Sequence, residues 1–418
     1  MTEYLSASVI NGTLKAVPSK SHAHRVLVAA ALADAPCDVV CPAVSEDITA
    51  TVRCLNALGA DITRTADGFR VLPVGEVAKG ATLDCGESGT TLRFMLPVSC
   101  ALGADAKFVG GGRLPLRPIG GLADTLEKHG VQFSARALPL SLKGKLSAGQ
   151  YDVDGSVSSQ YVSGMLLALG SLGGRSVLTV SGKSVSRGYV DMTLEVLGEF
   201  GVATERKADG SGFAVCGSGC VSPREVTVEG DWSGAAFPLA AGVLAGDVTV
   251  TGLNPDSTQR DKIIVDILRS MGGDVTFAAN GVRARKSALR RITADVTDVP
   301  DLAPVLSVLM AAAEGNSVMT GVGRLRDKES DRLAAIVENL AAMGVHSETG
   351  DDSLTVFGGT LRGGFLARGY GDHRMVMSAA VAALAVGGGI TDCEAVAKSY
   401  PDFFADIAKL GGRINESV

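Results

Sequence analysis

The chain has 418 residues, more than the roughly 250 to 300 at which a single hydrophobic core stops growing, so we expect two domains. A formal net charge of −6 and a single Trp argue against a nucleic-acid partner, because they provide neither a positive field nor a stacking surface. Hydrophobic residues make up 46% of the chain, but their runs end well short of a membrane span. Composition therefore predicts a soluble globular protein with no membrane or nucleic-acid partner, and we expect a monomer.

The N-terminal segment and the cysteines show no sign of export or of a metal centre. The segment MTEYLSASVINGTLKAV lacks the basic and apolar regions of an export signal, so we expect a cytoplasmic protein. The eight cysteines are spread from Cys37 to Cys393, and the pairs Cys37/Cys41 and Cys216/Cys220 have no His neighbours. We therefore expect free thiols, with a zinc site as the weaker alternative.

A five-residue motif that starts with an apolar residue and ends in Gly recurs six times along the chain. Each copy has the pattern of an amphipathic helix end, with Gly in the left-handed closing position and, in most copies, an alternating strand behind it. The copies end at Gly59, Gly130, Gly201, Gly272, Gly344 and Gly411, with separations of 71, 71, 71, 72 and 67 residues. Chance matches among 53 glycines are the alternative, and the near-constant spacing favours a true repeat.

A second helix is predicted in each repeat, out of phase with the first. A small or acidic turn precedes an Ala/Leu-rich run, which closes on Gly before a β-branched strand. The turns are PSKSHAHR, CGESGTTLR, DGSVSSQ, EGDWSGAA, VPDLAP and GYGDHRM. Positions near the predicted helix starts are Ser21, Ser88, Ser158, Ser233, Asp301 and Asp372, separated by 67, 70, 75, 68 and 71 residues. Both predicted helices therefore recur with a nearly constant spacing along the whole chain.

Three repeats are expected in each domain, with a crossover between Pro223 and Asp231. The sixth repeat reaches Val418 before its closing strands, so the segment from Tyr4 to Leu14 is expected to supply one of them. These boundaries place the first domain at residues 15–228 and a discontinuous second domain at residues 1–14 and 229–418.

Polar residues gather at the predicted helix starts of the first half. A helix N-terminus exposes unpaired N–H groups and a partial positive charge, which suits anions. Lys20, Ser21 and Arg25 lie within about one helical turn, so two cations and a hydroxyl can meet one phosphate or carboxylate. Gly89, directly after Ser88, lets the backbone approach a ligand closely. Taken singly, each turn is equally well explained as a capped, solvated helix start.

Two further segments of the first half carry basic or neutral donors. The glycines of GGGRLPLRPI precede Arg113 and Arg117, whose guanidinium forks match phosphate geometry. The segment GSVSSQ presents Ser158, Ser159 and Gln160, which suit phosphate and hydroxyl groups. A basic surface turn and an ordinary helix cap are the plain alternatives.

The second half adds carboxylates to the basic residues. The segments are VPD, RLRDKESDR, GDHR and AKSYPDFF, which contain Asp301, Lys328, Glu329, Arg332, Asp372, His373, Arg374 and Lys398. Such a charge run is usually a solvated helix face, and a lone His is usually a structural hydrogen bonder. Several of these segments coincide with the repeat's helix starts, so together they favour a site for a polyanionic ligand.

The order and spacing of these segments resemble the enolpyruvyl transferase family over essentially the whole chain. The matching strings are PSKSHAHR, SGTTLR, LRPIGGL, GSVSSQ, VSRGYVDMTL, the Asp of VPD, KESDRL, GDHRM and AKSYPDFF. Within the family they are most similar to the shikimate branch. The resemblance implies an α/β fold, a two-domain inside-out α/β barrel built from six βαβαββ repeats, three per domain.

The resemblance also implies an activity: transfer of the enolpyruvyl group of phosphoenolpyruvate to the 5-hydroxyl of shikimate 3-phosphate, without metal or organic cofactor. Carried over by position, the expected shikimate 3-phosphate contacts are Lys20, Ser21, Arg25, Ser158, Ser159, Gln160, Ser186, Asp301 and Lys328. The expected phosphoenolpyruvate contacts are Lys20, Gly89, Arg117, Gln160, Arg332, Arg374 and Lys398. Asp301 is the expected base, and Glu329, with Lys20, the expected acid.

Three positions depart from the family's pattern. Arg324 stands where the family often has Asn, and Glu87 and Phe94 stand where the best-known members have Asn and Pro. These departures bear on the shape of the pocket wall near Gly89, and Arg324 is assigned no role.

Two alternatives remain at this stage. The branch that uses UDP-N-acetylglucosamine typically has a reactive Cys in the loop before the RP pair, and GGGRLPLRPI contains none. A non-catalytic phospho-ligand binding protein is the other alternative. The carboxylates of Asp301 and Glu329 disfavour it, because anion binding alone gains nothing from them.

Overall fold

The computed structural model describes residues 1–182, 186–217 and 219–416, and the chain divides into two compact units. One unit is Lys20–Val228, and the other combines Met1–Ser19 with Glu229–Val418. The sequence analysis assigned residues 15–19 to the first domain, whereas the structure groups them with the second unit. Lys15 ends the strand β2 (Ile10–Lys15), which pairs in parallel with β15 (Gly246–Thr251). The backbone of Ser19 also donates to the carbonyl of Glu229 at 2.8 Å.

The unit of residues 20–228 contains three sheets of four strands each. Their orders are β14-β3-β5-β4, β6-β7-β9-β8 and β10-β11-β13-β12, and in each sheet only the first pair of strands is parallel. The helices are α1 (Lys20–Ala31), α2 (Glu46–Ala57), α3 (Gly89–Leu102), η1 (Leu114–Leu116), α4 (Gly120–Glu127), α5 (Ser159–Ser171) and α6 (Arg187–Glu199). The strands are β3 (Cys37–Val40), β4 (Asp61–Arg64), β5 (Gly68–Leu72), β6 (Ala81–Asp84), β7 (Ala106–Val109), β8 (Gln132–Phe133), β9 (Leu140–Lys143), β10 (Gln150–Asp154), β11 (Gly174–Ser181), β12 (Ala203–Arg206), β13 (Gly212–Gly217) and β14 (Glu225–Thr227).

The other unit repeats this plan with sheets β16-β17-β15-β2, β18-β19-β21-β20 and β22-β23-β1-β24. Its helices are α7 (Trp232–Ala245), η2 (Arg260–Ile263), α8 (Ile264–Ser270), α9 (Ala303–Ala312), η3 (Gly323–Asp327), α10 (Arg332–Ala342), α11 (His373–Val386), η4 (Cys393–Lys398) and α12 (Phe403–Lys409). Besides β2 and β15, its strands are β1 (Glu3–Ser6), β16 (Asp274–Ala278), β17 (Gly281–Arg285), β18 (Thr293–Asp295), β19 (Gly315–Thr320), β20 (Ser347–Thr349), β21 (Ser353–Gly358), β22 (Phe365–Ala367), β23 (Gly388–Ile390) and β24 (Arg413–Glu416).

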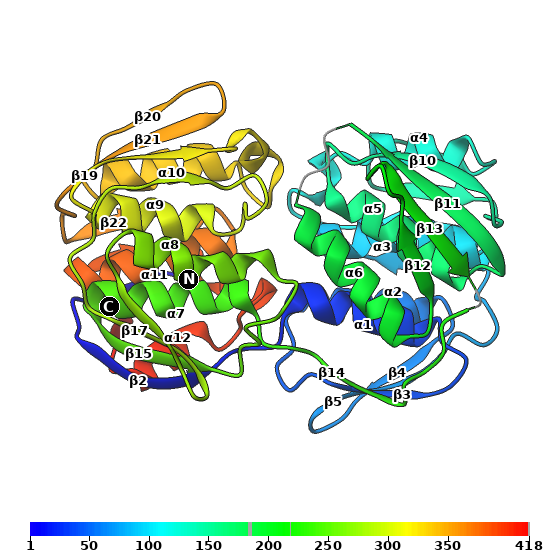
Figure 1. The fold of residues 1–418 in the computed structure, drawn as a ribbon, viewed down its shortest axis with the longest axis horizontal. Helices are drawn as coiled ribbons and strands as arrows, with labels where there is room; N and C mark the ends of the chain where they lie inside the picture. Colours follow the sequence, from blue (N-terminus) through cyan, green and yellow to red (C-terminus); the bar gives the residue numbers. More distant parts are fainter. Residues whose placement is uncertain (183–185, 218, 417–418) are drawn as a thin grey trace. The chain divides into compact units, whose positions relative to one another are not determined.

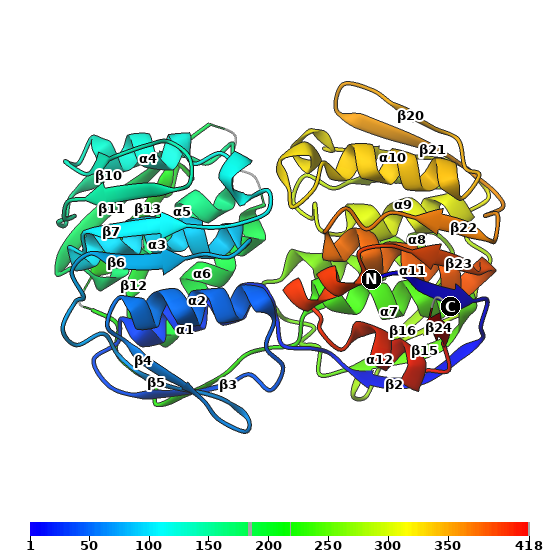
Figure 2. The ribbon, with the colours of Figure 1, turned by 180° about the vertical axis from the view of Figure 1, so that it is seen from behind.

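The N-terminal segment supplies strands to two sheets of this unit, one more than the sequence predicts. β2 is the edge strand of one sheet, and β1 lies between β23 and β24 in another, antiparallel to both (Figure 2). The end of the first unit behaves similarly, because β14 returns to pair with β3 and completes the sheet of the first repeat.

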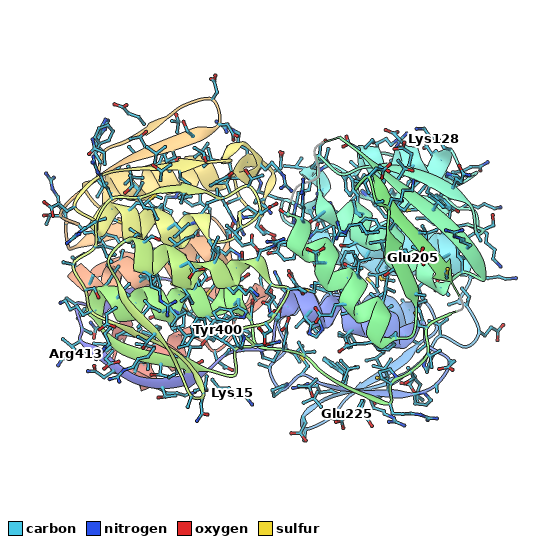
Figure 3. The ribbon with its side chains drawn as sticks, in the orientation of Figure 1. Lys15, Lys128, Glu205, Glu225, Tyr400 and Arg413 are labelled. Carbon is cyan, nitrogen blue, oxygen red and sulfur yellow. The ribbon has the colours of Figure 1, made fainter. Side chains whose placement is uncertain are left out.

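Each unit is an inside-out arrangement in which three helices form the centre and the sheets lie outside them. The central helices are α1, α3 and α5 in one unit and α7, α9 and α11 in the other, and nearly all of their residues are buried (Figure 1). Helices that are apolar nearly all round, such as α7 and α9, are typically buried in a protein core. Charged residues such as Lys128 after α4 and Glu205 on β12 are exposed, and Figure 3 labels both. The fold is the predicted α/β class, with six βαβαββ repeats, three in each unit.

The local signals of the repeat are borne out. All six closing glycines have positive φ, from 71° at Gly201 to 111° at Gly59, which glycine adopts without steric strain. Each central helix begins within two residues of its predicted position. Ser88, Ser158, Asp231 and Asp372 cap α3, α5, α7 and α11 by accepting a backbone N–H.

The eight cysteines are free thiols, as predicted. No helix in the described part of the chain is long and apolar enough to cross a membrane. Within those same residues, no group of three or more His, Cys, Asp or Glu side chains is placed to hold a metal ion.

Candidate active site

The predicted site residues of the first unit lie around the starts of α1, α3 and α5. Lys20 forms an ion pair with Asp47 of α2, with Nζ 2.7 Å from Oδ2. Gln160, in the first turn of α5, accepts from Nη1 of Arg93 at 2.6 Å and donates to the hydroxyl of Thr90 at 2.7 Å. Arg93 and Thr90 belong to α3, so these bonds connect the start of α5 to the start of α3.

Arg117 lies directly over the start of α3. A Cβ atom added to Gly89 would stand 2.4 Å from Nη1 of Arg117 and 2.6 Å from its Cζ. The guanidinium therefore occupies the space that the glycine leaves open. Glu87 is packed in the same way against the loop before Arg117, because a Cβ on Gly112 would stand 2.2 Å from its Oε2. Glu87, which stands where the best-known members of the family have Asn, therefore contacts the loop that contains Gly112.

Arg25 is buried, with an exposed fraction of 2%, and joins α1 to α5 and α6. It donates to the hydroxyls of Thr193 and Ser163 at 2.8 and 3.2 Å and to the carbonyls of Ser21 and Tyr189 at 2.6 and 2.9 Å. Burial lowers the pKa of Arg25 to about 9. These bonds use four of the five N–H groups that a guanidinium carries, all toward other described residues.

The predicted serines occupy helix starts. Ser158 accepts the backbone N–H of Gln160 at 3.3 Å, and Ser159 is the buried first residue of α5. Ser186 precedes α6 with a left-handed φ of 53°. Ser21 lies in the first turn of α1 and uses its carbonyl for the bond from Arg25. The structure therefore places neutral donors at three helix starts of this unit.

Arg332 is the centre of the predicted site residues in the second unit. Its side chain is 1% exposed and makes three ion pairs of 2.8 Å each, with Asp301 through Nη1, with Asp372 through Nε and with Glu329 through Nη2. Ser330 donates to Asp372 at 3.1 Å, which further fixes this carboxylate. A buried guanidinium needs such partners, because an uncompensated buried charge is strongly destabilising.

Asp301 accepts a second guanidinium and faces an ammonium. Nη2 of Arg374 lies 2.8 Å from its Oδ2, and Nζ of Lys328 lies 4.0 Å from its Oδ1. Burial alone would raise the pKa of Asp301, but Arg374, Lys328 and Arg332 together hold it well below its ordinary value. Burial lowers the pKa of Lys328 to about 8, and the positive charge of Arg324 acts in the same direction.

Lys398 and His373 lie near the start of α11. Nζ of Lys398 donates to the carbonyl of Gly371 at 2.6 Å, which brings this predicted cation to the turn before the helix. His373 is the buried first residue of α11, with Nδ1 3.8 Å from Oδ1 of Asp372.

Sequence reasoning missed three polar residues next to the predicted ones. Asp47 holds Lys20, Arg93 holds Gln160, and Asp261 accepts a hydrogen bond from Ser233 at the start of α7. Arg93 belongs to the string SGTTLR, so it could have been predicted from the sequence. Asp47 and Asp261 follow no motif, and only the tertiary packing brings them to the helix starts.

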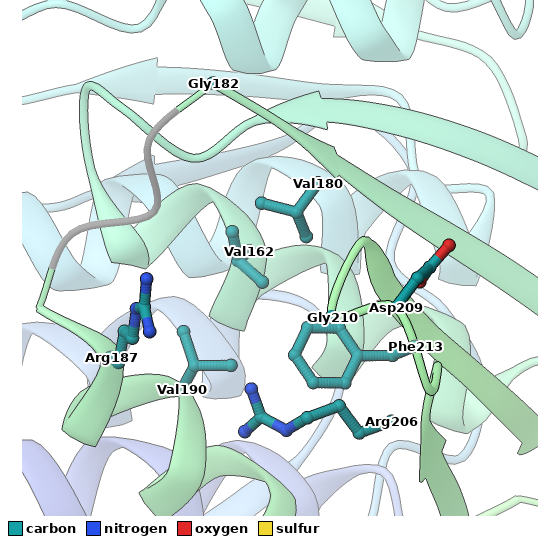
Figure 4. Close-up of a pocket in the computed structure, with 9 residues that line it drawn as sticks. All are labelled: Val162, Val180, Gly182, Arg187, Val190, Arg206, Asp209, Gly210 and Phe213. Atoms are coloured by element: carbon teal, nitrogen blue, oxygen red, sulfur yellow. The ribbon is translucent and has the colours of Figure 1, made fainter.

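A pocket elsewhere in the first unit contains none of the predicted residues. In Figure 4 it lies between α5, α6 and the strands β11 and β13, with Phe213 across it and Asp209 turned away. Arg206 stacks on Phe213 and pairs with Asp191. The lining residues are Val162, Val180, Gly182, Arg187, Val190, Arg206, Asp209, Gly210 and Phe213.

Comparison with known proteins agrees with this geometry. The family model of EPSP synthase (3-phosphoshikimate 1-carboxyvinyltransferase) matches residues 6–407. The chain belongs to the EPSP synthase family. A 3-phosphoshikimate 1-carboxyvinyltransferase of Clostridium acetobutylicum is 36% identical over 416 residues, which cover 97% of this chain and 96% of that protein. One of Methanothrix thermoacetophila is 39% identical over 423 residues, which cover 99% of each chain.

Solved structures of EPSP synthases have the same fold. The structure of EPSP synthase from Acinetobacter baumannii superposes with a TM-score of 0.81 at 26% identity and covers 99% of both chains. The resemblance to the enolpyruvyl transferases inferred from the motifs is therefore confirmed, including its shikimate branch.

Proposed function

We propose that this chain transfers the enolpyruvyl group of phosphoenolpyruvate to the 5-hydroxyl of shikimate 3-phosphate and releases phosphate, as a step of the shikimate pathway. The observation that supports it best is the cluster around Arg332, where two acids, Asp301 and Glu329, share buried cations. Asp372 and one further carboxylate would be enough to compensate the buried charge of Arg332, whereas acid–base chemistry needs two separate groups that exchange protons.

We propose that two sets of residues, which share Lys20 and Gln160, bind the two substrates. Shikimate 3-phosphate is assigned to Lys20, Ser21, Arg25, Ser158, Ser159, Gln160, Ser186, Asp301 and Lys328. Phosphoenolpyruvate is assigned to Lys20, Gly89, Arg117, Gln160, Arg332, Arg374 and Lys398. In support, hydroxyls and an amide gather at helix starts of the first unit, and the guanidinium forks of Arg332 and Arg374 are fixed by hydrogen bonds.

The reaction is an addition followed by an elimination. The 5-hydroxyl oxygen bonds to C2 of phosphoenolpyruvate while Asp301 takes its proton, and C3 receives a proton from Glu329 to become a methyl group. C3 then returns one proton to Glu329, the C2–C3 double bond forms again, and the C2–oxygen bond to phosphate breaks. The proton held by Asp301 passes to the departing phosphate, so both carboxyl groups return to their starting states. All atoms and charges balance without a redox step, and each proton transfer typically contributes about 10² to 10⁴-fold to the rate.

Ligand binding would make Asp301 a better base. While Arg374 and Arg332 are paired with Asp301, its proton affinity is low. Phosphoenolpyruvate offers a carboxylate and a phosphate as competing partners for the same guanidiniums. As these pairs weaken, the pKa of Asp301 rises toward the range in which a carboxylate accepts a proton.

Phosphorus NMR of the purified protein with both substrates tests the proposed function. We expect the phosphoenolpyruvate signal to disappear as inorganic phosphate and one new phosphomonoester appear in equal amounts. Phosphate release without a new phosphomonoester would indicate simple hydrolysis and would overturn the proposal.

Asp301→Asn tests the assigned base separately. We expect shikimate 3-phosphate to bind within about tenfold of wild type and turnover to fall by roughly 10² or more, because the amide keeps the size and loses the basic oxygen. Near-normal turnover would remove Asp301 from its assigned role.

We further propose that the protein acts as a cytoplasmic monomer. Light scattering coupled to gel filtration should give a mass close to the chain mass of 42.7 kDa, and twice that value would reject the monomer.

A further inference from the structure

Four buried side chains form a hydrogen-bonded chain across α1, α2 and α3. Nδ1 of His24 lies 2.7 Å from the hydroxyl of Thr51, which lies 2.7 Å from that of Thr91. The hydroxyl of Thr91 lies 2.8 Å from Ser88 Oγ, and the backbone N–H of Thr91 donates to the same oxygen at 3.2 Å. None of the four residues exposes more than 1% of its surface.

The imidazole at one end of this chain is neutral. Burial, with the charges of Lys20 and Arg25, lowers the pKa of His24 well below its ordinary value. A neutral ring bonds to Thr51 through Nδ1 in either tautomer, and the bond between Thr51 and Thr91 can run in either direction. One end of the chain is therefore the imidazole of α1, and the other is the capping oxygen of α3.

Both cations assigned to phosphoenolpyruvate in this unit depend on the elements that the chain joins. Ser88 caps α3 immediately before Gly89, over which Arg117 lies. On α2, one turn before Thr51, Asp47 holds Lys20, and the carbonyl of Asp47 lies 3.5 Å from the Thr91 hydroxyl. A shift of α2 against α3 would therefore move both Lys20 and Arg117.

We propose that the chain from His24 to Ser88 is a positioning device for phosphoenolpyruvate, and that it acts through Lys20 and Arg117 without touching the ligand. This inference rests on the proposed function. Removal of the Thr51 hydroxyl leaves Nδ1 of His24 without its partner and takes one of the hydrogen bonds of Thr91. A shift of α2 and α3 would relieve this loss. Ser158 and Ser159, assigned to shikimate 3-phosphate, lie on α5 and take no part in the chain.

Thr51→Val removes the central hydroxyl and keeps the side-chain shape. We expect the KM for phosphoenolpyruvate to rise about fivefold to thirtyfold, with kcat within about threefold of wild type. The KM for shikimate 3-phosphate should rise less, because only Lys20 of the two displaced cations is also assigned to that substrate. Thr51→Ser retains the hydroxyl and should restore most of the loss.

Thr125→Val is the matched control, because this buried threonine of α4 donates to the carbonyls of Gly121 and Asp152, away from the chain. It should leave both KM values near wild type. An unchanged KM for phosphoenolpyruvate in Thr51→Val, an equal rise for both substrates, or the same effect in Thr125→Val would each overturn the proposal.

A second variant covers the case in which Thr51→Val does not fold. Nε2 of His24 has no hydrogen-bond partner among the residues that the structure describes, so the one hydrogen bond that His24→Phe removes is the bond to Thr51, while the slightly larger ring fills the site. The same selective rise in KM is expected, and its absence would contradict the inference.

Hydrogen exchange at the amides of Gly89, Thr90 and Thr91 separates this proposal from the proposed function. Thr51→Val should accelerate exchange there relative to Thr125→Val even if the wild-type protein shows no transferase activity, in which case only the proposed function would fail. Unchanged exchange would contradict the positioning role itself.

Discussion

Asp261 lies buried beside Ser233 at the start of α7, and its ionisation should be measurable as a change in stability. Burial, together with the negative charge of Asp301, raises the pKa of Asp261 to about 7. The carboxyl in the unfolded chain has a pKa of about 3.9, so the folded state holds this proton more tightly. The contribution of Asp261 to stability is therefore lost progressively as the pH rises from about 4 to about 7.

Asp261→Asn should remove this pH dependence. The free energy of unfolding of the variant and of wild type is measured by urea denaturation at pH 5 and at pH 8. The value for the variant minus the value for wild type should be about 1 to 3 kcal/mol larger at pH 8 than at pH 5. Asp247→Asn is the control, because its exposed carboxyl has a pKa lowered by Arg283 and is ionised at both pH values. A difference from wild type that is equal at pH 5 and pH 8 would show that Asp261 does not titrate in this range.

Lys328 should limit binding of the phosphorylated acceptor at high pH. Its pKa of about 8 means that the ammonium loses its charge above pH 8. We expect the KM for shikimate 3-phosphate to rise by up to about tenfold per pH unit between pH 8 and 9.5. Lys328→Arg keeps its charge throughout, so its KM should rise less over the same interval and stay flat up to about pH 8.5, below the pKa of about 9 of Arg25. A parallel rise in both proteins would assign the effect to another group.

At the scale of residues, the sequence could name the polar residues of the motifs but not their partners. Lys20, Arg117 and Asp301 were found because helix starts attract anions and because their motifs resemble those of a known family. The pairing of Lys20 with Asp47, and the use of Arg25 to join three helices, depend on residues 27 to 168 positions away along the chain. No local pattern encodes such pairs.

At the scale of elements, the start of α3 shows how closely a helix and a loop are fitted together. Gly89→Ala would place a methyl group 2.4 Å from Arg117 and force the guanidinium to move. The guanidinium is the far end of a flexible side chain and can give way, so the cost should lie near the low end of the about 1 to 3 kcal/mol typical of overpacking. Because the cation is displaced from the helix start, we expect the KM for phosphoenolpyruvate to rise roughly fivefold in steady-state assays.

Gly120→Ala is the matched control for this variant. Gly120 also begins a helix of the same unit, and its added Cβ would meet nothing within 4 Å. Its KM should stay near that of wild type. Equal effects of the two substitutions would mean that the contact between Gly89 and Arg117 does not govern ligand binding.

Among the elements, the ends of helices were predicted most accurately from the sequence. The helix ends at Gly59 and Gly201 depend on local backbone sterics, so a short sequence motif is enough to predict them. Strand pairing is not local, since β1 meets β23 and β24 about four hundred residues away along the chain. The sequence therefore predicted that the N-terminus completes a sheet but missed that it contributes to two.

At the scale of the molecule, the two units differ in how they use the chain. Every strand of the three sheets in residues 20–228 comes from that segment itself. Residues 229–418 alone lack β1 and β2, which leaves one sheet without an inner strand and another without its edge strand.

We therefore expect the fragment 20–228 to unfold cooperatively when produced alone and the fragment 229–418 not to. A circularly permuted chain that joins residues 1–19 to the end of 229–418 through a flexible linker should regain a cooperative transition by circular dichroism. A cooperative transition of similar stability in 229–418 without residues 1–19 would show that the two strands are dispensable.

The central claim is the choice of acceptor, and phosphate release from phosphoenolpyruvate measures it most directly. With shikimate 3-phosphate as acceptor we predict saturable phosphate release in proportion to product, and with UDP-N-acetylglucosamine a kcat/KM at least about 10³-fold lower, because binding groups placed for one acceptor are left unpaired by the other. Release that is equally fast with both acceptors, faster with the nucleotide sugar, or independent of any acceptor would contradict the account.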